Sequence, residues 1–249
     1  MQKISMLRNT QIIILGLCVA AATIVSSVIL SKGMLRVMQF NKEVIDVTGS
    51  AEKKIVSDYI VWNGAFDVRA VELKSAYAKL QADLETVKNY LMSKGISEKE
   101  LIIDQVSTKI LYKKNEKGHD TNDIEGYLLR QTVEVRSKDV QKVSEISRQV
   151  TELIDKDIQF LSGSPEYFYT KLAELKIEML ARATADAKER AISMATSAGN
   201  KIGLMRSAKM GVFQITPVNS YEVSWYGSND TSSFEKKVMA VVSASFAIE

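Results

Sequence analysis

Two serine–lysine pairs have a spacing that is used in covalent catalysis. Ser50 with Lys53 and Ser233 with Lys236 both match the S-x-x-K pattern of serine acyl-transfer enzymes. In those enzymes the serine opens a helix and further motifs complete the site. Here we expect each pair at a strand edge or in a loop, and neither S-D-N nor K-T-G occurs in the sequence. We therefore predict no acyl-transfer site.

The acidic residues around the single histidine are the other candidate for chemistry. His119 lies near Asp120, Asp123 and Glu125, a set that could hold a divalent metal in a loop. The same segment is rich in lysine and lacks the EF-hand spacing, and such a segment is more often a solvated turn than a metal site. Glycine-rich phosphate loops and G-x-S-x-G are also missing. We predict no catalytic residues, no metal, no cofactor and no enzymatic activity.

Three large aromatic residues within six positions form the candidate binding site of the chain. Tyr221, Trp225 and Tyr226 lie in the polar stretch SYEVSWYGSNDTSSF. Trp and Tyr are enriched where proteins bind each other, so this loop is a candidate partner contact. Two alternatives stay open, because the same rings could cover a sheet edge or rest on a membrane surface.

The net charge of +3 belongs to the N-terminus and not to the folded part. Residues 1–42 carry five Lys or Arg and no acid, while residues 43–249 carry 28 basic and 30 acidic side chains. A nucleic-acid-binding domain would show a basic excess on its folded part, so we predict no nucleic-acid partner. The only cysteine, Cys18, lies in the apolar N-terminal segment, which excludes disulfides and thiol chemistry from the remainder.

Residues 12–30 form an uncharged apolar run of nineteen residues. As a helix the run spans roughly 28 Å, close to the hydrocarbon thickness of a bilayer. A cleavable signal peptide is the alternative, with Ala20–Ala22 as its cleavage site, but the run continues to Leu30 and favours an anchor that is retained. We assign residues 1–10 to a short N-terminal tail, 11–31 to a transmembrane signal anchor, 32–42 to a basic linker and 43–249 to a folded domain. The flanking charges are nearly balanced and leave the orientation open.

The apolar periodicity of residues 43–249 predicts strands that alternate with long amphipathic helices. We expect strands over 44–48, 55–66, 101–112, 127–136, 158–161, 208–217 and 237–248, and helices over 67–95, 138–153 and 166–198. The stretch between the third and fourth strands is expected to be a hairpin loop. Asp67 is expected as the N-cap of the first helix, and the segment Ser137-Lys138-Asp139 is expected to cap the second. Gly95 is expected to end the first helix.

Two helix faces are expected to pack on a sheet. In the first helix the apolar stripe consists of Leu73, Tyr77, Leu80, Leu84, Val87 and Leu91. A coiled-coil seam is its alternative. In the last helix the inner face is small and consists of Ala183, Ala187, Ala191, Ala195 and Ala198. Small side chains let a helix approach its neighbour closely, so we expect tight packing there.

Several short sequence patterns follow one another in a characteristic order along residues 44–249. They are Val47-Thr48-Gly49, Ser57-Asp58, Lys94-Gly95-Ile96, Val106-Ser107-Thr108, Gly126-Tyr127, and the alanine spacing from Ala181 to Ala195 followed by Gly199 and Gly203. In this order the chain resembles the SIMPL-domain family, which includes the YggE-like envelope proteins of bacteria. At Ser57 the proline that is usual in the family is replaced.

The resemblance implies an α+β domain of antiparallel strands and long amphipathic helices, preceded here by one transmembrane helix. It also implies export beyond the inner membrane to the periplasm and, for some members, ring-like oligomers and links to envelope or oxidative stress. It supplies no agreed activity and no catalytic residues. We therefore expect a single-pass protein of the inner membrane that self-associates or binds an envelope protein. The alternatives are an enzyme or small-ligand binder without a sequence signature, and a signalling adaptor that faces the cytoplasm.

Overall fold

The computed structural model describes residues 2–40, 44–220 and 222–249, with side chains described from residue 14 to 35 within the N-terminal helix. The chain divides into two compact units. Unit 1 comprises Met1–Ser50, Ala181–Gly211 and Val241–Glu249, and unit 2 comprises Ala51–Leu180 and Val212–Ala240. Helices combine with mostly antiparallel sheets, so the expected α+β class is confirmed.

The N-terminal helix α1 (Gln2–Phe40) contains the apolar run and extends into the ranges assigned to the tail and the linker. Its segment Ile14–Leu35 has a mean hydropathy of 2.3, and none of this segment is buried in the structure. A helix satisfies its own backbone hydrogen bonds, which a bilayer requires of any segment that crosses it. By length and composition α1 could therefore be a membrane anchor or a signal sequence.

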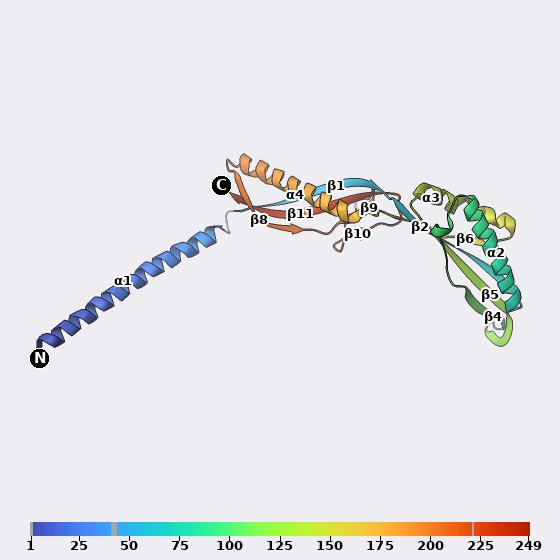
Figure 1. The fold of residues 1–249 in the computed structure, drawn as a ribbon, viewed down its shortest axis with the longest axis horizontal. Helices are drawn as coiled ribbons and strands as arrows, with labels where there is room; N and C mark the ends of the chain where they lie inside the picture. Colours follow the sequence, from blue (N-terminus) through green and yellow to red (C-terminus); the bar gives the residue numbers. More distant parts are fainter. Residues whose placement is uncertain (1, 41–43, 221) are drawn as a thin grey trace. The chain divides into compact units, whose positions relative to one another are not determined.

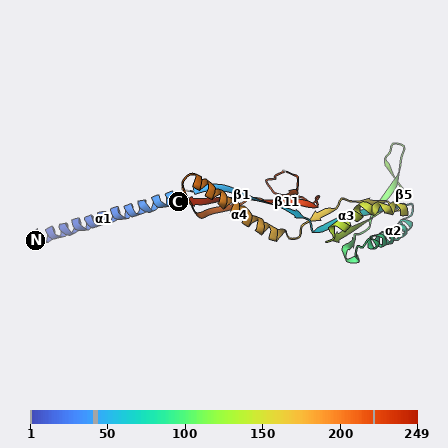
Figure 2. The same cartoon turned by 90° about the horizontal axis from the view of Figure 1, so that it is seen from above.

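Unit 2 is built on a sheet whose central pair is β2 (Tyr59–Ala70) and β5 (Asp120–Ser137). These strands pair antiparallel from Ile60 opposite Ser137 to Ala70 opposite Tyr127. The strands β3 (Leu101–Ile103) and β4 (Ser107–Lys114) pair with β5, and β6 (Phe160–Ser162) and β7 (Glu166–Phe168) pair with β2. Figure 2 shows the β4–β5 hairpin projecting beyond the helices of this unit.

Two helices, α2 (Leu73–Ser93) and α3 (Val140–Gln149), pack on this sheet (Figure 1). Short 3₁₀ turns, η1 (Glu98–Glu100) and η2 (Val150–Lys156), follow the two helices. Trp62 and Phe66 lie at the centre of the core, and the ring of Phe160 is 5.9 and 6.3 Å from theirs. The buried stripe of α2 runs through Leu80, Leu84, Val87 and Leu91, as its periodicity predicts.

The start of α2 differs from the prediction. Because β2 continues to Ala70, the helix begins at Leu73 and Asp67 is not its cap. The Asp67 carboxylate instead accepts two hydrogen bonds from Arg130 on the neighbouring strand, at 2.6 and 2.8 Å. Leu73 and Tyr77, which were expected in the core, are exposed at the start of this helix.

The end of α2 and the cap of α3 agree with the prediction. Gly95 follows α2 with a φ of +91°, a conformation that glycine adopts without strain, and its N–H donates to Met92 O. Asp139 caps α3 by accepting a hydrogen bond from the Lys142 N–H at 3.2 Å. The predicted hairpin loop is shorter than expected, because β4 reaches Lys114 and β5 begins at Asp120.

The last helix, α4 (Leu172–Ser197), starts later than predicted because Glu166–Phe168 forms β7 on β2. In unit 1 its alanines at 183, 187, 191 and 195 are buried and Ala198 is exposed. The second sheet contains β1 (Val44–Val56), β8 (Ile202–Met210), β9 (Gln214–Pro217), β10 (Ser228–Asn229) and β11 (Glu235–Ile248). Within unit 1, β8 pairs antiparallel with the second half of β11, and α4 runs along β1 and β11 (Figure 1).

Gly49 explains why the helix face is small. A Cβ atom at this position would lie 2.2 Å from Ala183 O and 2.3 Å from Ala187 N. The backbones of β1 and α4 are therefore in direct contact, which is the tight packing that the alanine spacing predicts. The apolar cluster beside this contact is Val47, Ala187, Ala191, Ala244 and Phe246.

Candidate functional site

The aromatic loop (residues 218–227) joins β9 to β10 in unit 2 and carries the predicted partner contact. Trp225 and Tyr226 are 95% and 97% exposed, so neither ring covers a sheet edge. That alternative is wrong for these two residues. Tyr221 lies outside the described residues. The structure leaves a partner contact and a membrane contact as the two remaining interpretations of the exposed rings.

A buried glutamine holds the base of the aromatic loop. Gln214 begins β9 and is 3% exposed, and its side-chain amide donates to Ser224 O at 2.7 Å and accepts from the Ser224 N–H at 3.3 Å. Gly227 closes the loop with a φ of +87° and donates its N–H to Ser224 O. The rings at 225 and 226 are thus presented from a fixed base. Sequence reasoning missed Gln214, although a glutamine that starts a short apolar strand is a weak signal of such a role.

The lysines of the two S-x-x-K pairs, Lys53 and Lys236, bind groups other than the serines of their pairs. Lys53 Nζ forms an ion pair with Glu178 at 2.7 Å. The Ser50 N–H donates to the Asp186 carboxylate at 2.7 Å, and this hydrogen bond is the main cause of the lowered pKa of Asp186. Both serines lie outside helices, at a strand and in a loop. The geometry of an acyl-transfer serine is therefore not present at Ser50.

Lys236 is a buried cation that stabilises the segment around β7 and β11. Its Nζ donates to Tyr167 O at 2.6 Å and to Asp230 O. Burial lowers the pKa of Lys236, and the nearby charge of Asp230 partly opposes this. Burial acts to raise the pKa of Asp230, but hydrogen bonds from Ser232 and Ser233 and the Lys236 charge lower it overall. With both backbone carbonyls bound, this lysine serves the fold.

His119 closes the tip of the β4–β5 hairpin. Its N–H donates to Asn115 Oδ1 at 3.0 Å, and its carbonyl accepts from the Asn115 N–H at 2.8 Å. The side chain is exposed. Among the described residues, no three His, Cys, Asp or Glu side chains are arranged to hold a metal ion. The turn interpretation accounts for this segment.

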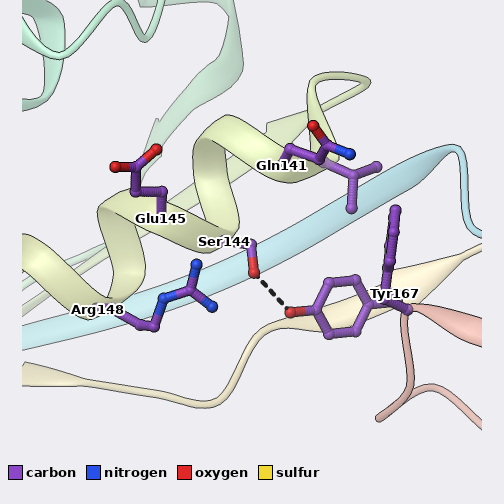
Figure 3. Close-up of a pocket in the computed structure, with 7 residues that line it drawn as sticks. Gln141, Ser144, Glu145, Arg148 and Tyr167 are labelled. Atoms are coloured by element: carbon purple, nitrogen blue, oxygen red, sulfur yellow. Dashed lines mark hydrogen bonds between the residues drawn. The ribbon is translucent and has the colours of Figure 1, made fainter.

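A pocket that sequence reasoning did not find lies on α3, beside β7 (Figure 3). Its volume is about 430 Å³, and it is lined by Val140, Gln141, Ser144, Glu145, Arg148, Tyr167 and Phe234. The residues of α3 among these recur at helical spacing, which places them on one face. Their convergence with two rings from distant parts of the chain required the tertiary structure.

One family model matches this sequence. It is described as "SIMPL: Protein of unknown function (DUF541)" and covers residues 45–246, which is most of the chain. No curated protein matches the chain.

Proposed function

This chain belongs to the SIMPL family, and on that premise we propose that it is a membrane-anchored protein that acts by binding other protein chains and not by catalysis. In this proposal residues 12–30 cross the inner, cytoplasmic membrane once and the folded residues lie in the periplasm. The partner is a second copy of the chain or another protein of the envelope. A link to envelope stress would follow from such a contact.

The observation that carries the proposal is the exposure of Trp225 and Tyr226 on a loop with a fixed base. Leaving two large aromatic rings in water is unfavourable, and burying one at an interface typically contributes about 2 kcal/mol or more to binding. Because Gln214 already orders the base of the loop, less conformational entropy is lost when a partner binds to it. The surrounding loop is polar, which suits the rim of a protein interface.

The test is the mass of the full chain after gentle detergent extraction. We expect light scattering to show an assembly larger than a monomer, and the double variant Trp225→Ser/Tyr226→Ser to shift it toward the monomer. The matched control is Tyr77→Ser, which removes another exposed ring of unit 2. Monomer alone, in several detergents and at high concentration, would refute self-association.

A partner other than a second copy is tested in cells. A photo-crosslinking amino acid at position 226 should give an adduct of defined mass with an envelope protein, whereas the same amino acid at position 77 should not. An enzymatic role has no observation in its favour beyond the pocket on α3. The cytoplasmic adaptor role depends only on the orientation of α1.

A further inference from the structure

The pocket on α3 contains a cation that the protein does not neutralise. The Arg148 guanidinium lines the pocket and forms no ion pair or hydrogen bond with any of the described residues. Most arginines in unit 2 form ion pairs, for example Arg130 with Asp67 and Arg69 with Glu125. A planar guanidinium with free donors is suited to bind a carboxylate through two parallel hydrogen bonds.

A pair of hydroxyl groups faces the same space. Ser144 Oγ and Tyr167 OH are 2.8 Å apart, and either atom can be the donor. In both arrangements one hydroxyl hydrogen is used between the two residues and the other is left for a ligand oxygen. Figure 3 shows the tyrosine hydroxyl pointing at Ser144, on the side of α3 toward which Arg148 also extends. Gln141, at the other end of the pocket, adds an amide that makes no hydrogen bond with the described residues.

The remaining wall is apolar. The rings of Tyr167 and Phe234 meet edge to face with centroids 6.0 Å apart, and Val140 lies beside them. A pocket of about 430 Å³ falls within the range of natural small-molecule sites, which combine apolar walls with a few convergent polar groups. The size and lining therefore suit a small ligand with one apolar part and one polar end.

We propose that this pocket binds small organic carboxylates that carry an apolar group. The carboxylate is bound by Arg148 and by the hydroxyl pair of Ser144 and Tyr167, and the apolar group packs on the rings of Tyr167 and Phe234. This site is separate in its residues from the aromatic loop. It neither requires nor excludes the partner contact at Trp225 and Tyr226.

One charge opposes the ligand. Glu145 also lines the pocket, and its carboxylate accepts a hydrogen bond from Gln149 Nε2 at 2.9 Å. Figure 3 shows it directed away from the hydroxyl pair. Because like charges repel, Glu145 weakens the binding of a carboxylate without blocking its place. Removing the Arg148 charge should therefore weaken binding of the carboxylate, and removing the Glu145 charge should strengthen it.

The experiment titrates the full chain in detergent with two matched probes, N-acetylphenylalanine and its neutral C-terminal amide, and measures binding by calorimetry at low salt. The two probes differ only in the carboxylate. We expect saturable binding of the acid and several-fold weaker binding of the amide, because Arg148 is exposed and solvent screens its attraction for the carboxylate. N-acetylleucine should also bind, since the apolar wall is not specific for a ring.

Variants assign the binding to the pocket. Arg148→Gln should weaken binding of the acid several-fold, Tyr167→Phe should weaken it while keeping the ring, and Glu145→Gln should strengthen it. The matched control is Arg69→Gln, an exposed arginine of the same unit outside the pocket. Arg148→Lys keeps the charge and should retain part of the affinity, which separates loss of charge from loss of folding. Trp225→Ser/Tyr226→Ser should bind the acid as the wild type does.

Three results would overturn the proposal. They are equal binding of the acid and the amide, wild-type affinity in a folded Arg148→Gln variant, and no saturable binding of either acid. The last would show that the unpaired arginine and the hydroxyl pair do not form a carboxylate site. None of the three bears on the assembly state, so the partner proposal stands or falls separately.

Discussion

Gly49→Ala tests the closest contact in unit 1. The Cβ atom that this substitution adds would lie 2.2 Å from Ala183 O, 2.3 Å from Ala187 N and 2.7 Å from Ala187 Cα. Ordinary contacts of a Cβ atom begin near 3.4 Å. All three neighbours belong to the backbone of α4, so no side-chain rotation relieves the overlap. The helix must move away from β1 by roughly 1 Å.

The cost follows from what that movement separates. A radial gap of about 0.5–1 Å forfeits roughly a quarter to a half of the attraction at each contact, and here the gap opens across the cluster of Val47, Ala187 and Phe246. Overpacked cores lose about 1–3 kcal/mol, and rigid backbone neighbours place this case at the upper end. Alanine lowers the entropy of the unfolded chain and returns up to about 1 kcal/mol. We expect a net loss of about 2–3 kcal/mol, or about 5–10 °C in Tm.

The assay is thermal unfolding of the full chain in detergent, followed by far-ultraviolet circular dichroism. Gly211→Ala is the control in unit 1, because the nearest atom to its added Cβ is Val241 O at 3.3 Å, an overlap that a much smaller shift of the backbone relieves. Its Tm should change little. A Gly49→Ala variant as stable as this control would refute the direct contact of β1 with α4.

Three further predictions concern unit 2. Hydrogen bonds from Ser137 and Ser97 lower the pKa of Glu100, so its contribution to stability is present above the unfolded pKa of about 4.3 and is lost as the pH falls through the folded value. Glu100→Gln should therefore destabilise at pH 7, and urea titrations should show the difference shrinking toward pH 3. Ser57→Ala removes a buried hydroxyl that has no hydrogen-bond partner among the described residues. The free energy of unfolding, measured in the same urea titration, should rise by about 1 kcal/mol. A decrease would show that the hydroxyl forms a hydrogen bond in the folded protein. Gln214→Leu should free the aromatic loop, and hydrogen exchange at residues 222–227 should rise several-fold. Unchanged protection would show that Gln214 does not hold the base of the loop.

Much of the fold is predictable from local pattern, and two of the wrong helix boundaries share one cause. The stripe from Leu80 to Leu91 and the strand expected over 237–248 are long periodic segments, and the structure confirms both. The boundaries at Asp67 and Glu166 were set by pairing with distant strands. Arg130 on β5 engages Asp67, and β7 pairs with β2 before α4 begins. Cross-strand partners of this kind leave no signal within a local window.

The candidate site divides in the same way. The aromatic loop is visible in the sequence because three large rings stand in a polar stretch. The exposure of the rings is not visible in the sequence, because it depends on the hydrogen bonds between Gln214 and Ser224. The pocket on α3 was missed because Arg148 reads as an ordinary surface residue until the rings of Tyr167 and Phe234 are placed beside it.

The central claim, that residues 12–30 anchor a folded part outside the cytoplasm, is tested by labelling from one side of the membrane. In a Cys18→Ser background the chain has no cysteine, and Lys117→Cys then places a thiol at the exposed tip of the β4–β5 hairpin. The account predicts that a membrane-impermeant maleimide labels the full-length, membrane-bound chain in intact spheroplasts as strongly as after lysis. Labelling only after lysis, or labelling of a shortened soluble chain, would contradict it.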